Sequence, residues 1–274
     1  MKTFGAIEAG GTKWVCGIGT GPDDLERVQF PTTTPEETIG AAIAYFSSRN
    51  IAALGIGSFG PVDLTRGRIT STPKAFWQNT DVAGPMRAAL GIPVGFDTDV
   101  NAAALGESKW GAAQGVSSCI YLTVGTGVGG GAIVNGHLLH GAMHPEMGHI
   151  KLPTADSFAG NCPFHGDCLE GVAAGPAIER RWGVPSTQLP PGHPAWAMEA
   201  RYLALAIANF SYVLSPEVVI LGGGVMQQAH LFPMIRSELE AILNNYIAAP
   251  AVLPPKLGTS SGVLGALALA QAAL

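Results

Sequence analysis

The sequence has few charged residues and no apolar stretch long enough to cross a bilayer. Charged residues make up only 13% of the 274 positions, and the net charge is −5. Such a chain lacks the basic surface that binds a nucleic-acid backbone. The apolar run Val263–Leu274 is far shorter than the roughly twenty residues that span a membrane, and the first residues do not resemble a signal peptide. We therefore expect no nucleic-acid partner and no membrane partner.

Cysteine is also scarce, with four residues in the whole chain. Four cysteines make a weak disulfide framework at this length, which favours a reducing cytoplasm. Cys16 and Cys119 lie in apolar, strand-like runs and are expected to be buried thiols. Glycine and proline are plentiful instead, at 37 and 20 residues. They predict many tight turns and loops in which the backbone can approach a ligand closely.

The other two cysteines belong to the stretch Gly141–Glu170, in which potential metal ligands are concentrated. Cys-x-x-His-x-x-Cys is close enough in spacing to surround one small ion, and a nearby histidine can complete a tetrahedral Cys2His2 zinc site. The predicted ligands are His149, Cys162, His165 and Cys168. The alternative is a loop with two ordinary buried cysteines and a surface histidine. Glu146 and Glu170 flank the cluster, and a purely structural zinc site would not require them.

Three glycine-rich loops follow apolar, strand-like runs. The first, Glu8–Lys13, joins two predicted strands; the second, Gly125–Gly131, also lies between strands; the third, Gly222–Gly224, follows the strand Glu217–Leu221. Glycine at such a turn lets backbone N–H groups reach an anion. Neither hairpin loop is a Walker A motif or a Rossmann fingerprint, because no helix follows it immediately. One such loop could be an ordinary turn, but two of them indicate paired phosphate-facing hairpins.

Two acids, Asp97 and Asp99, lie between the predicted strand Ile92–Phe96 and the predicted helix Val100–Trp110. Asp99 could be a helix cap, for which aspartate is well suited. However, open α/β folds place their chemistry at this end of a strand. The loop Ser71–Asn79, rich in polar and aromatic residues, is either a surface loop or a wall of a ligand site. In the second case Asn79 is a candidate for substrate binding.

Together these features predict a phosphotransferase. Phosphoryl transfer requires positioned phosphates, stabilised charge and a base that accepts the proton of the acceptor hydroxyl. Glycine loops can hold the phosphates of a nucleotide, and Asp99 is the best candidate for the base. Glu146, His149 and Glu170 offer several groups that can bind the hydroxyls of a sugar.

The motifs resemble those of the ROK family of sugar kinases and related repressors, over essentially the whole chain. The resemblance rests on segments that occur in the family's order: Glu8–Lys13, Asp97–Asn101, Val124–Gly131, Glu146–His149, Cys162–Glu170 and Leu221–Val225. It implies an α/β chain with the two-lobed actin/hexokinase-like (ribonuclease H-like) ATPase fold. We expect one lobe from residues 1–112 and the C-terminal helix 258–274, and the other from residues 113–257.

The resemblance also implies roles for individual residues. Asp99 matches the catalytic base, and Glu146, His149 and Glu170 match the sugar ligands, with His149 also binding zinc. The residues that match the nucleotide-binding motifs are Gly10, Gly11, Thr12, Lys13, Thr126, Gly127, Gly222, Gly223 and Gly224. The implied cofactors are structural Zn²⁺ and the Mg²⁺ that accompanies ATP, and a homodimer is expected.

Three positions depart from the usual family pattern. Glu8 replaces an aspartate, Thr98 replaces an asparagine, and His165 replaces a zinc-binding thiolate. These variants, together with the segment Thr72–Asp81, are more similar to bacterial fructokinases than to glucokinases of the family. We therefore expect phosphoryl transfer from ATP to the 6-hydroxyl of a hexose, with fructose first. A mannokinase or glucokinase is the nearest alternative, and a non-enzymatic sugar-sensing regulator is a more distant one.

Overall fold

The computed structural model describes residues 2–154 and 156–274 and contains two compact units. Unit 1 comprises the described residues up to Gln114, together with Leu138–His144 and Lys256–Leu274. Unit 2 comprises Gly115–His137 and the described part of Pro145–Pro255. The chain therefore returns to unit 1 twice after first leaving it, once for a segment of only seven residues.

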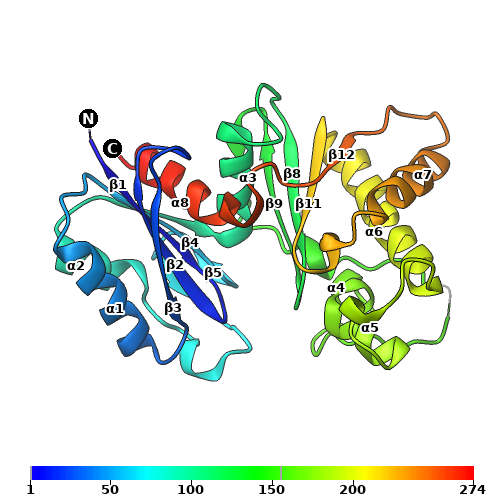
Figure 1. Cartoon of the computed structure of the whole chain (residues 1–274), viewed down its shortest axis with the longest axis horizontal. Helices are drawn as coiled ribbons and strands as arrows, with labels where there is room; N and C mark the ends of the chain where they lie inside the picture. Colours follow the sequence, from blue (N-terminus) through cyan, green and yellow to red (C-terminus); the bar gives the residue numbers. More distant parts are fainter. Residues whose placement is uncertain (1, 155) are drawn as a thin grey trace. The chain divides into compact units, whose positions relative to one another are not determined.

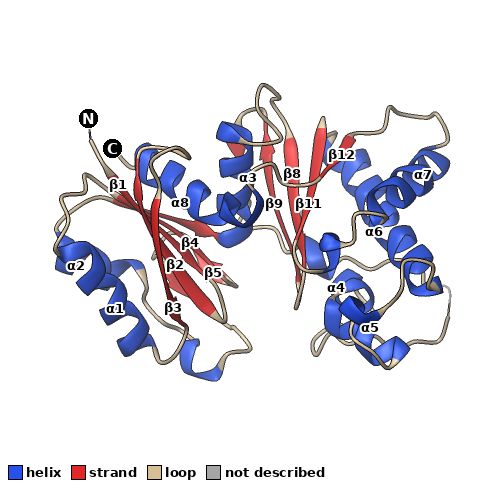
Figure 2. Ribbon diagram, in the orientation of Figure 1, coloured by secondary structure: helices blue, strands red, loops and turns tan. Residues whose placement is uncertain are grey.

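Each unit is built on one mixed sheet with helices (Figure 1, Figure 2). The strands and helices of unit 1 are β1 (Phe4–Ala9), β2 (Lys13–Gly19), β3 (Glu26–Pro31), α1 (Pro35–Ser47), β4 (Leu54–Ser58), β5 (Val62–Asp63), β6 (Arg68–Ile69), η1 (Ala75–Trp77), α2 (Ala83–Leu90), β7 (Val94–Thr98), α3 (Asp99–Trp110), η5 (Gly258–Ser260) and α8 (Ser261–Ala272). Those of unit 2 are β8 (Cys119–Val124), β9 (Val128–Val134), η2 (Met147–His149), α4 (Leu169–Ala173), α5 (Gly175–Trp182), η3 (Ser186–Gln188), α6 (Pro194–Leu214), β11 (Val218–Gly222), η4 (Val225–Gln227), α7 (Leu231–Leu243) and β12 (Ala251–Leu253). The short strand β10 (His137–Leu138) lies at the boundary between the two sets of residues.

The sheet of unit 1 has the strand order β3-β2-β1-β4-β7. The hairpin strands β1, β2 and β3 pair in antiparallel fashion, whereas β4 and β7 are added parallel to β1. Parallel neighbours need crossover connections, and α1 and α2 lie in these connections. Alternate residues of β1 face different sides: Ile7 packs in the cluster that includes α1 and α2, and Ala6 packs against α8.

Small residues allow α8 to lie directly on this sheet. A Cβ at Gly55 would lie 1.8 Å from the carbonyl oxygen of Ala266 in α8. A Cβ at Gly265 would lie 1.6 Å from the carbonyl oxygen of Ala102 in α3. These contacts explain why the C-terminal helix is almost entirely apolar and why it packs with unit 1.

The sheet of unit 2 repeats the plan, with the order β10-β9-β8-β11-β12. Again a hairpin, β8–β9, is extended by parallel strands, β11 and β12. After the metal-ligand loop the chain forms two short helices, α4 and α5, rather than one continuous helix. The backbone of Ala174 is extended and separates them. In one continuous helix Pro176 would have no N–H for the carbonyl of Val172, and its ring would clash with that carbonyl. Further along the chain, α6 is a single helix of 21 residues.

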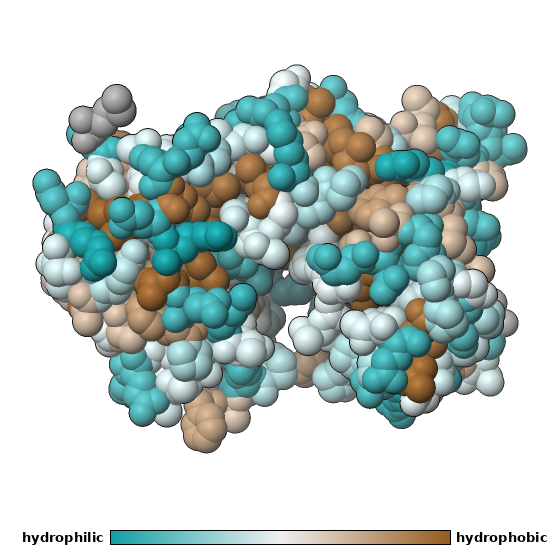
Figure 3. All heavy atoms as spheres, in the orientation of Figure 1, coloured by the Kyte–Doolittle hydropathy of each residue, from teal (hydrophilic) through white to brown (hydrophobic). Residues whose placement is uncertain are grey.

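Within the described residues, no helix is long and apolar enough to cross a membrane. On the face drawn in Figure 3, hydrophilic residues are interspersed with small groups of hydrophobic ones. The large hydrophobic side chains that remain most exposed include Phe76, Val213 and Tyr246.

One buried acid of α6 predicts a pH-dependent stability. Glu199 is 2% exposed, and its Oε1 has no hydrogen-bond partner among the described residues. Burial raises the pKa of Glu199 well above its usual value, against the opposing effect of Arg181. The folded state therefore retains a proton that the unfolded chain loses near pH 4.5, and folding stability falls as the pH rises above that value.

Glu199→Gln is accordingly expected to raise the free energy of unfolding at pH 8 by about 1–3 kcal/mol, with a smaller gain at pH 5. Urea unfolding at the two pH values measures this difference, and Glu240→Gln on the exposed side of α7 is the control. A gain that is the same at both pH values would show that Glu199 does not titrate on unfolding.

Candidate active site and metal centre

The turn between β1 and β2 has the geometry of an anion-binding loop. The N–H of Gly10 donates to the carbonyl of Lys13 at 3.0 Å, and Thr32 Oγ1 donates to the carbonyl of Gly10 at 2.7 Å. A Cβ at Gly10 would lie 2.8 Å from the Lys13 oxygen, so this position requires glycine. In the described part of the chain, no acceptor is found for the N–H groups of Gly11 and Thr12. Two N–H groups are thus available to a phosphate.

The acid before this turn is held under the C-terminal helix. Burial raises the pKa of Glu8, while Lys13 and the N–H of Val263 oppose that shift. A Cβ at position 262 would lie 2.5 Å from Glu8 Cδ. Glycine at position 262 is therefore what makes room for the glutamate side chain at position 8.

The two acids at the end of β7 have different surroundings. Asp97 is buried: its Oδ1 accepts from the N–H of Thr98 at 2.7 Å and from Asn101 Nδ2 at 2.9 Å. Its Oδ2 lies 2.8 Å from His140 Nε2. Asp99 is half-buried, and its Oδ1 accepts from the N–H of Val100 at 2.9 Å. Asp97 is therefore committed to structure, and Asp99 is the acid closer to solvent.

Asp99 is not the helix cap. Thr98 caps α3, since its Oγ1 accepts from the N–H of Asn101 at 3.1 Å, and Asp99 is the first helical residue. The threonine at position 98 thus has a structural role as the N-cap of α3, and the carboxylate of Asp99 accepts from the N–H of Val100 instead.

The glycine turn and Asp99 emerge from the same edge of the unit 1 sheet. Ala9, Ser58 and Thr98 stand side by side at the ends of the parallel strands β1, β4 and β7. Adjacent strands are about 4.8 Å apart, so two spacings separate the turn from Asp99 by roughly 10 Å. Open α/β sheets bind their ligands at this edge.

In unit 2 the other two glycine loops lie next to each other. A Cβ at Gly223, whose φ is 92°, would lie 2.4 Å from the carbonyl oxygen of Val124. The N–H of Gly125 donates to the carbonyl of Gly127 at 2.9 Å, which closes the loop around Thr126. The predicted nucleotide-binding positions of unit 2, from residue 126 to 127 and from 222 to 224, are thus brought together by β8 and β11.

Glu170 and Glu146 flank the metal cluster in different ways. Glu170 Oε2 accepts from the N–H of Val128 at 3.1 Å, which places it beside the loop that contains Gly127. Glu146 Oε2 lies 3.9 Å from His149 Nε2. Asn79 belongs to unit 1, where it is exposed and has a φ of 56°. It follows η1, and its N–H donates to the carbonyl of Thr70 at 3.0 Å.

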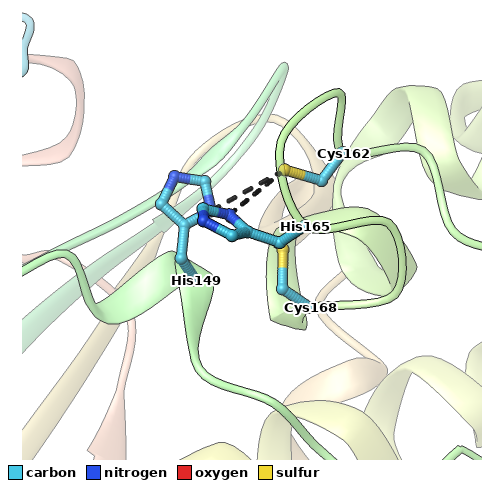
Figure 4. A group of neighbouring side chains, drawn as sticks. All are labelled: His149, Cys162, His165 and Cys168. Carbon is cyan, nitrogen blue, oxygen red and sulfur yellow. Dashed lines mark hydrogen bonds between the residues drawn. The ribbon is translucent and has the colours of Figure 1, made fainter.

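The four predicted metal ligands converge (Figure 4). His149 Nδ1 lies 3.5 Å from Cys168 Sγ and 3.8 Å from Cys162 Sγ, and His165 Nδ1 lies 3.7 Å from Cys162 Sγ. All four ligand atoms lie within 4.8 Å of one another. Tetrahedral zinc, with Zn–S of about 2.3 Å and Zn–N of about 2.0 Å, sets its ligand atoms roughly 3.3–3.8 Å apart. These side chains can therefore hold a metal ion with little movement.

The loop backbone explains how three of these ligands come from seven residues. Cys162 and Gly166 exchange two backbone hydrogen bonds, at 3.0 and 3.1 Å, and Gly166 has a φ of 62°. Cys168 then precedes the first turn of α4. Burial raises the pKa of the Cys168 thiol to about 11, so in the absence of a cation this sulfur remains protonated. A bound dication would favour the thiolate.

The family model for ROK matches residues 4–273. The chain belongs to the ROK family. Fructokinase from Pediococcus pentosaceus is 45% identical over 283 residues, which cover 99% of this chain and 98% of that protein. Among solved structures, a ROK hexokinase from Thermus thermophilus is 30% identical with a TM-score of 0.84, covering 98% of each chain. A ROK glucokinase from Streptomyces griseus, in complex with glucose and AMPPNP, is 27% identical with a TM-score of 0.82, covering 98% of this chain and 99% of that one.

These similarities confirm the predicted ROK membership and the actin/hexokinase-like α/β fold. Two histidines near the ROK motifs had no role in the sequence analysis. His140 contacts Asp97, and His144 Nε2 accepts from the N–H of Val62 at 3.0 Å. Both come from Leu138–His144, the short segment that packs with unit 1. The only signal in the sequence was their concentration just before Glu146.

Proposed function

We propose that this protein is an ATP-dependent hexose kinase that phosphorylates the 6-hydroxyl of fructose. The observation that carries the proposal is the placement of Asp99, which begins α3 on the same sheet edge as the glycine turn. A phosphoryl-transfer enzyme needs a base and a phosphate-binding loop at one site.

In the proposed reaction the sugar O6 attacks the γ-phosphorus of ATP. The O6–P bond forms as the bond between that phosphorus and the β–γ bridging oxygen breaks, and ADP leaves with the bond's electron pair. Asp99 accepts the hydroxyl proton. The N–H groups of Gly11 and Thr12, with the ammonium of Lys13, stabilise the phosphate charge. Mg²⁺ would accompany the ATP and neutralise part of that charge, and the carboxylates of Glu8 and Asp99 are the acidic groups at this edge that suit it.

The remaining nucleotide contacts are assigned to unit 2. Thr126 and Gly127 bind phosphate, and the loop Gly222–Gly224 flanks the ribose or base. This assignment is supported by the close approach of the two loops, since only a glycine fits at position 223 beside Val124.

We assign sugar binding to Glu146, His149, Glu170 and Asn79, and the bound metal to zinc. His149 turns Nδ1 toward the sulfur ligands and Nε2 toward Glu146. Zinc on Nδ1 would fix the proton on Nε2, which could then donate to a sugar hydroxyl. Four free thiols are consistent with a reducing cytoplasm, and a homodimer is the assembly that the family resemblance implies.

We assign fructose rather than glucose as the substrate because this chain is 45% identical to the Pediococcus pentosaceus fructokinase and 27% identical to the Streptomyces griseus glucokinase. We expect kcat/KM for fructose to exceed that for glucose and mannose by at least about 10-fold, a difference of about 1.4 kcal/mol in transition-state binding. A panel of hexoses with Mg·ATP, assayed through ADP release, measures the ranking. If kcat/KM is higher for glucose or mannose than for fructose, that hexose is the preferred substrate instead. If no hexose stimulates ADP release, the kinase assignment is overturned.

A further inference from the structure

A second lysine lies over the phosphate-binding turn of unit 1. A Cβ at Gly11 would lie 3.1 Å from Cε of Lys74 and 3.9 Å from its Cδ. The end of this side chain therefore passes across the α-carbon of Gly11, and its ammonium is one bond beyond Cε. Lys13, on the other side of the turn, is also exposed.

The segment that carries Lys74 is firmly held. Trp77, three residues later, is 2% exposed, and its ring centroid lies 5.6 Å from Trp14 and 5.7 Å from Phe59. Its Nε1 donates to the carbonyl of Thr33 at 2.8 Å. Because Trp14 directly follows Lys13 in β2, this packing fixes the segment of Lys74 against the strand that ends the turn.

The charge of Lys74 is available to a ligand. No ion pair of Lys74 with an acid is found within residues 2–154 and 156–274, and its side chain is exposed. Lys74 lies on a firmly held segment next to two N–H groups that lack acceptors. It therefore adds a positive charge to a site that can bind an anion. Preorganised positive charge of this kind acts most strongly where negative charge moves during the reaction.

We propose that Lys74 binds the terminal phosphoryl group of the nucleoside triphosphate and stabilises it during transfer. The inference rests on the proposed kinase function and adds a catalytic residue to it. As the bond from the γ-phosphorus to the β–γ bridging oxygen breaks and the bond to the sugar O6 forms, the Lys74 ammonium remains on the γ-phosphoryl oxygens. It gives up no proton, so the hydroxyl proton still goes to Asp99.

Two substitutions separate charge from side-chain bulk. Lys74→Met retains an unbranched apolar chain over Gly11 without the ammonium, and Lys74→Arg retains a cation. We expect Lys74→Met to lower kcat about 100-fold, the loss typical of one transition-state donor, with the fructose KM changed by less than about 3-fold. Lys74→Arg should recover at least about a tenth of the lost activity. Lys2→Met, at another exposed lysine of unit 1, is the control and should match the parent.

A binding measurement locates the contact on the nucleotide. By calorimetry with Mg²⁺, Lys74→Met should bind AMPPNP about 10-fold more weakly than the parent but bind ADP within about 3-fold of it. A kcat within about 3-fold of the parent would overturn the proposal, as would equal weakening of both nucleotides, which would place Lys74 on the β-phosphate or on the fold. If the parent phosphorylates no hexose, the proposed function fails separately. In that case calorimetry alone tests the role of Lys74. If the parent and Lys74→Met bind AMPPNP equally, or if neither binds it, the proposal is overturned.

Discussion

Asp99→Asn is expected to lower kcat for fructose phosphorylation by about 10³-fold, within the range given by loss of a general base. The amide retains the size of the carboxylate and can still accept from the N–H of Val100, so α3 should form normally. It cannot accept the hydroxyl proton as O6 attacks. The fructose dissociation constant should change by less than about 10-fold, since the loss is confined to the transition state. Steady-state kinetics with calorimetric sugar binding measures both quantities.

Asp97→Asn is the informative contrast, because the two acids are only two residues apart. Asp97 accepts hydrogen bonds from Thr98 and Asn101 and contacts His140, all within unit 1. Its substitution should lower thermal stability, whereas Asp99→Asn should leave the melting temperature nearly unchanged. Asp23→Asn, at an exposed position, controls for loss of one negative charge. Full turnover by Asp99→Asn would remove this residue from the mechanism and would reopen the choice of base.

Removal of the metal is expected to raise the hexose KM by at least about 10-fold before the protein unfolds. Loss of a group that orients a metal-bound histidine commonly lowers metal affinity or activity by about 10–100-fold. In Cys168→Ser the cluster loses a buried ligand, so His149 is no longer fixed with Nε2 toward Glu146. If the cluster binds zinc as proposed, zinc content should fall from one ion per chain to a small fraction. The melting temperature should also fall, since a metal that binds only the folded state stabilises it.

Cys16→Ala is the matched control for this experiment. Cys16 is also a fully buried cysteine, and burial raises the pKa of its thiol to about 12, so it stays protonated and offers no ligand. The control should retain one zinc ion and the parent hexose KM. Elemental analysis, melting curves and hexose kinetics measure the three effects. A zinc-free Cys168→Ser protein with the parent hexose KM would show that the cluster only stabilises the loop.

Much of the candidate site could be predicted from local sequence. Ligand types repeat every third residue from Cys162 to Cys168, and a loop that short cannot separate them far, so the convergence of the cluster followed from chain length. The glycine loops were recognisable because strand-like runs precede them. The N-cap of α3 was not settled by the sequence, however, which left Asp99 as a candidate for the cap. Aspartate and threonine both cap helices well, and only the backbone geometry shows that Thr98 takes this role and that Asp99 is the first helical residue.

The sequence by itself determined the ROK motifs, the four residues of the candidate metal cluster and the strand–loop–strand pattern of each unit, because all of these depend mainly on neighbours along the chain. Only the tertiary structure decided which acid of Asp97 and Asp99 is buried, where Leu138–His144 packs, and that Lys74 lies over Gly11. Those contacts join residues about 40 to 60 positions apart in the chain. They are set by strand register and by the packing of Trp77 on Trp14, which no local periodicity records.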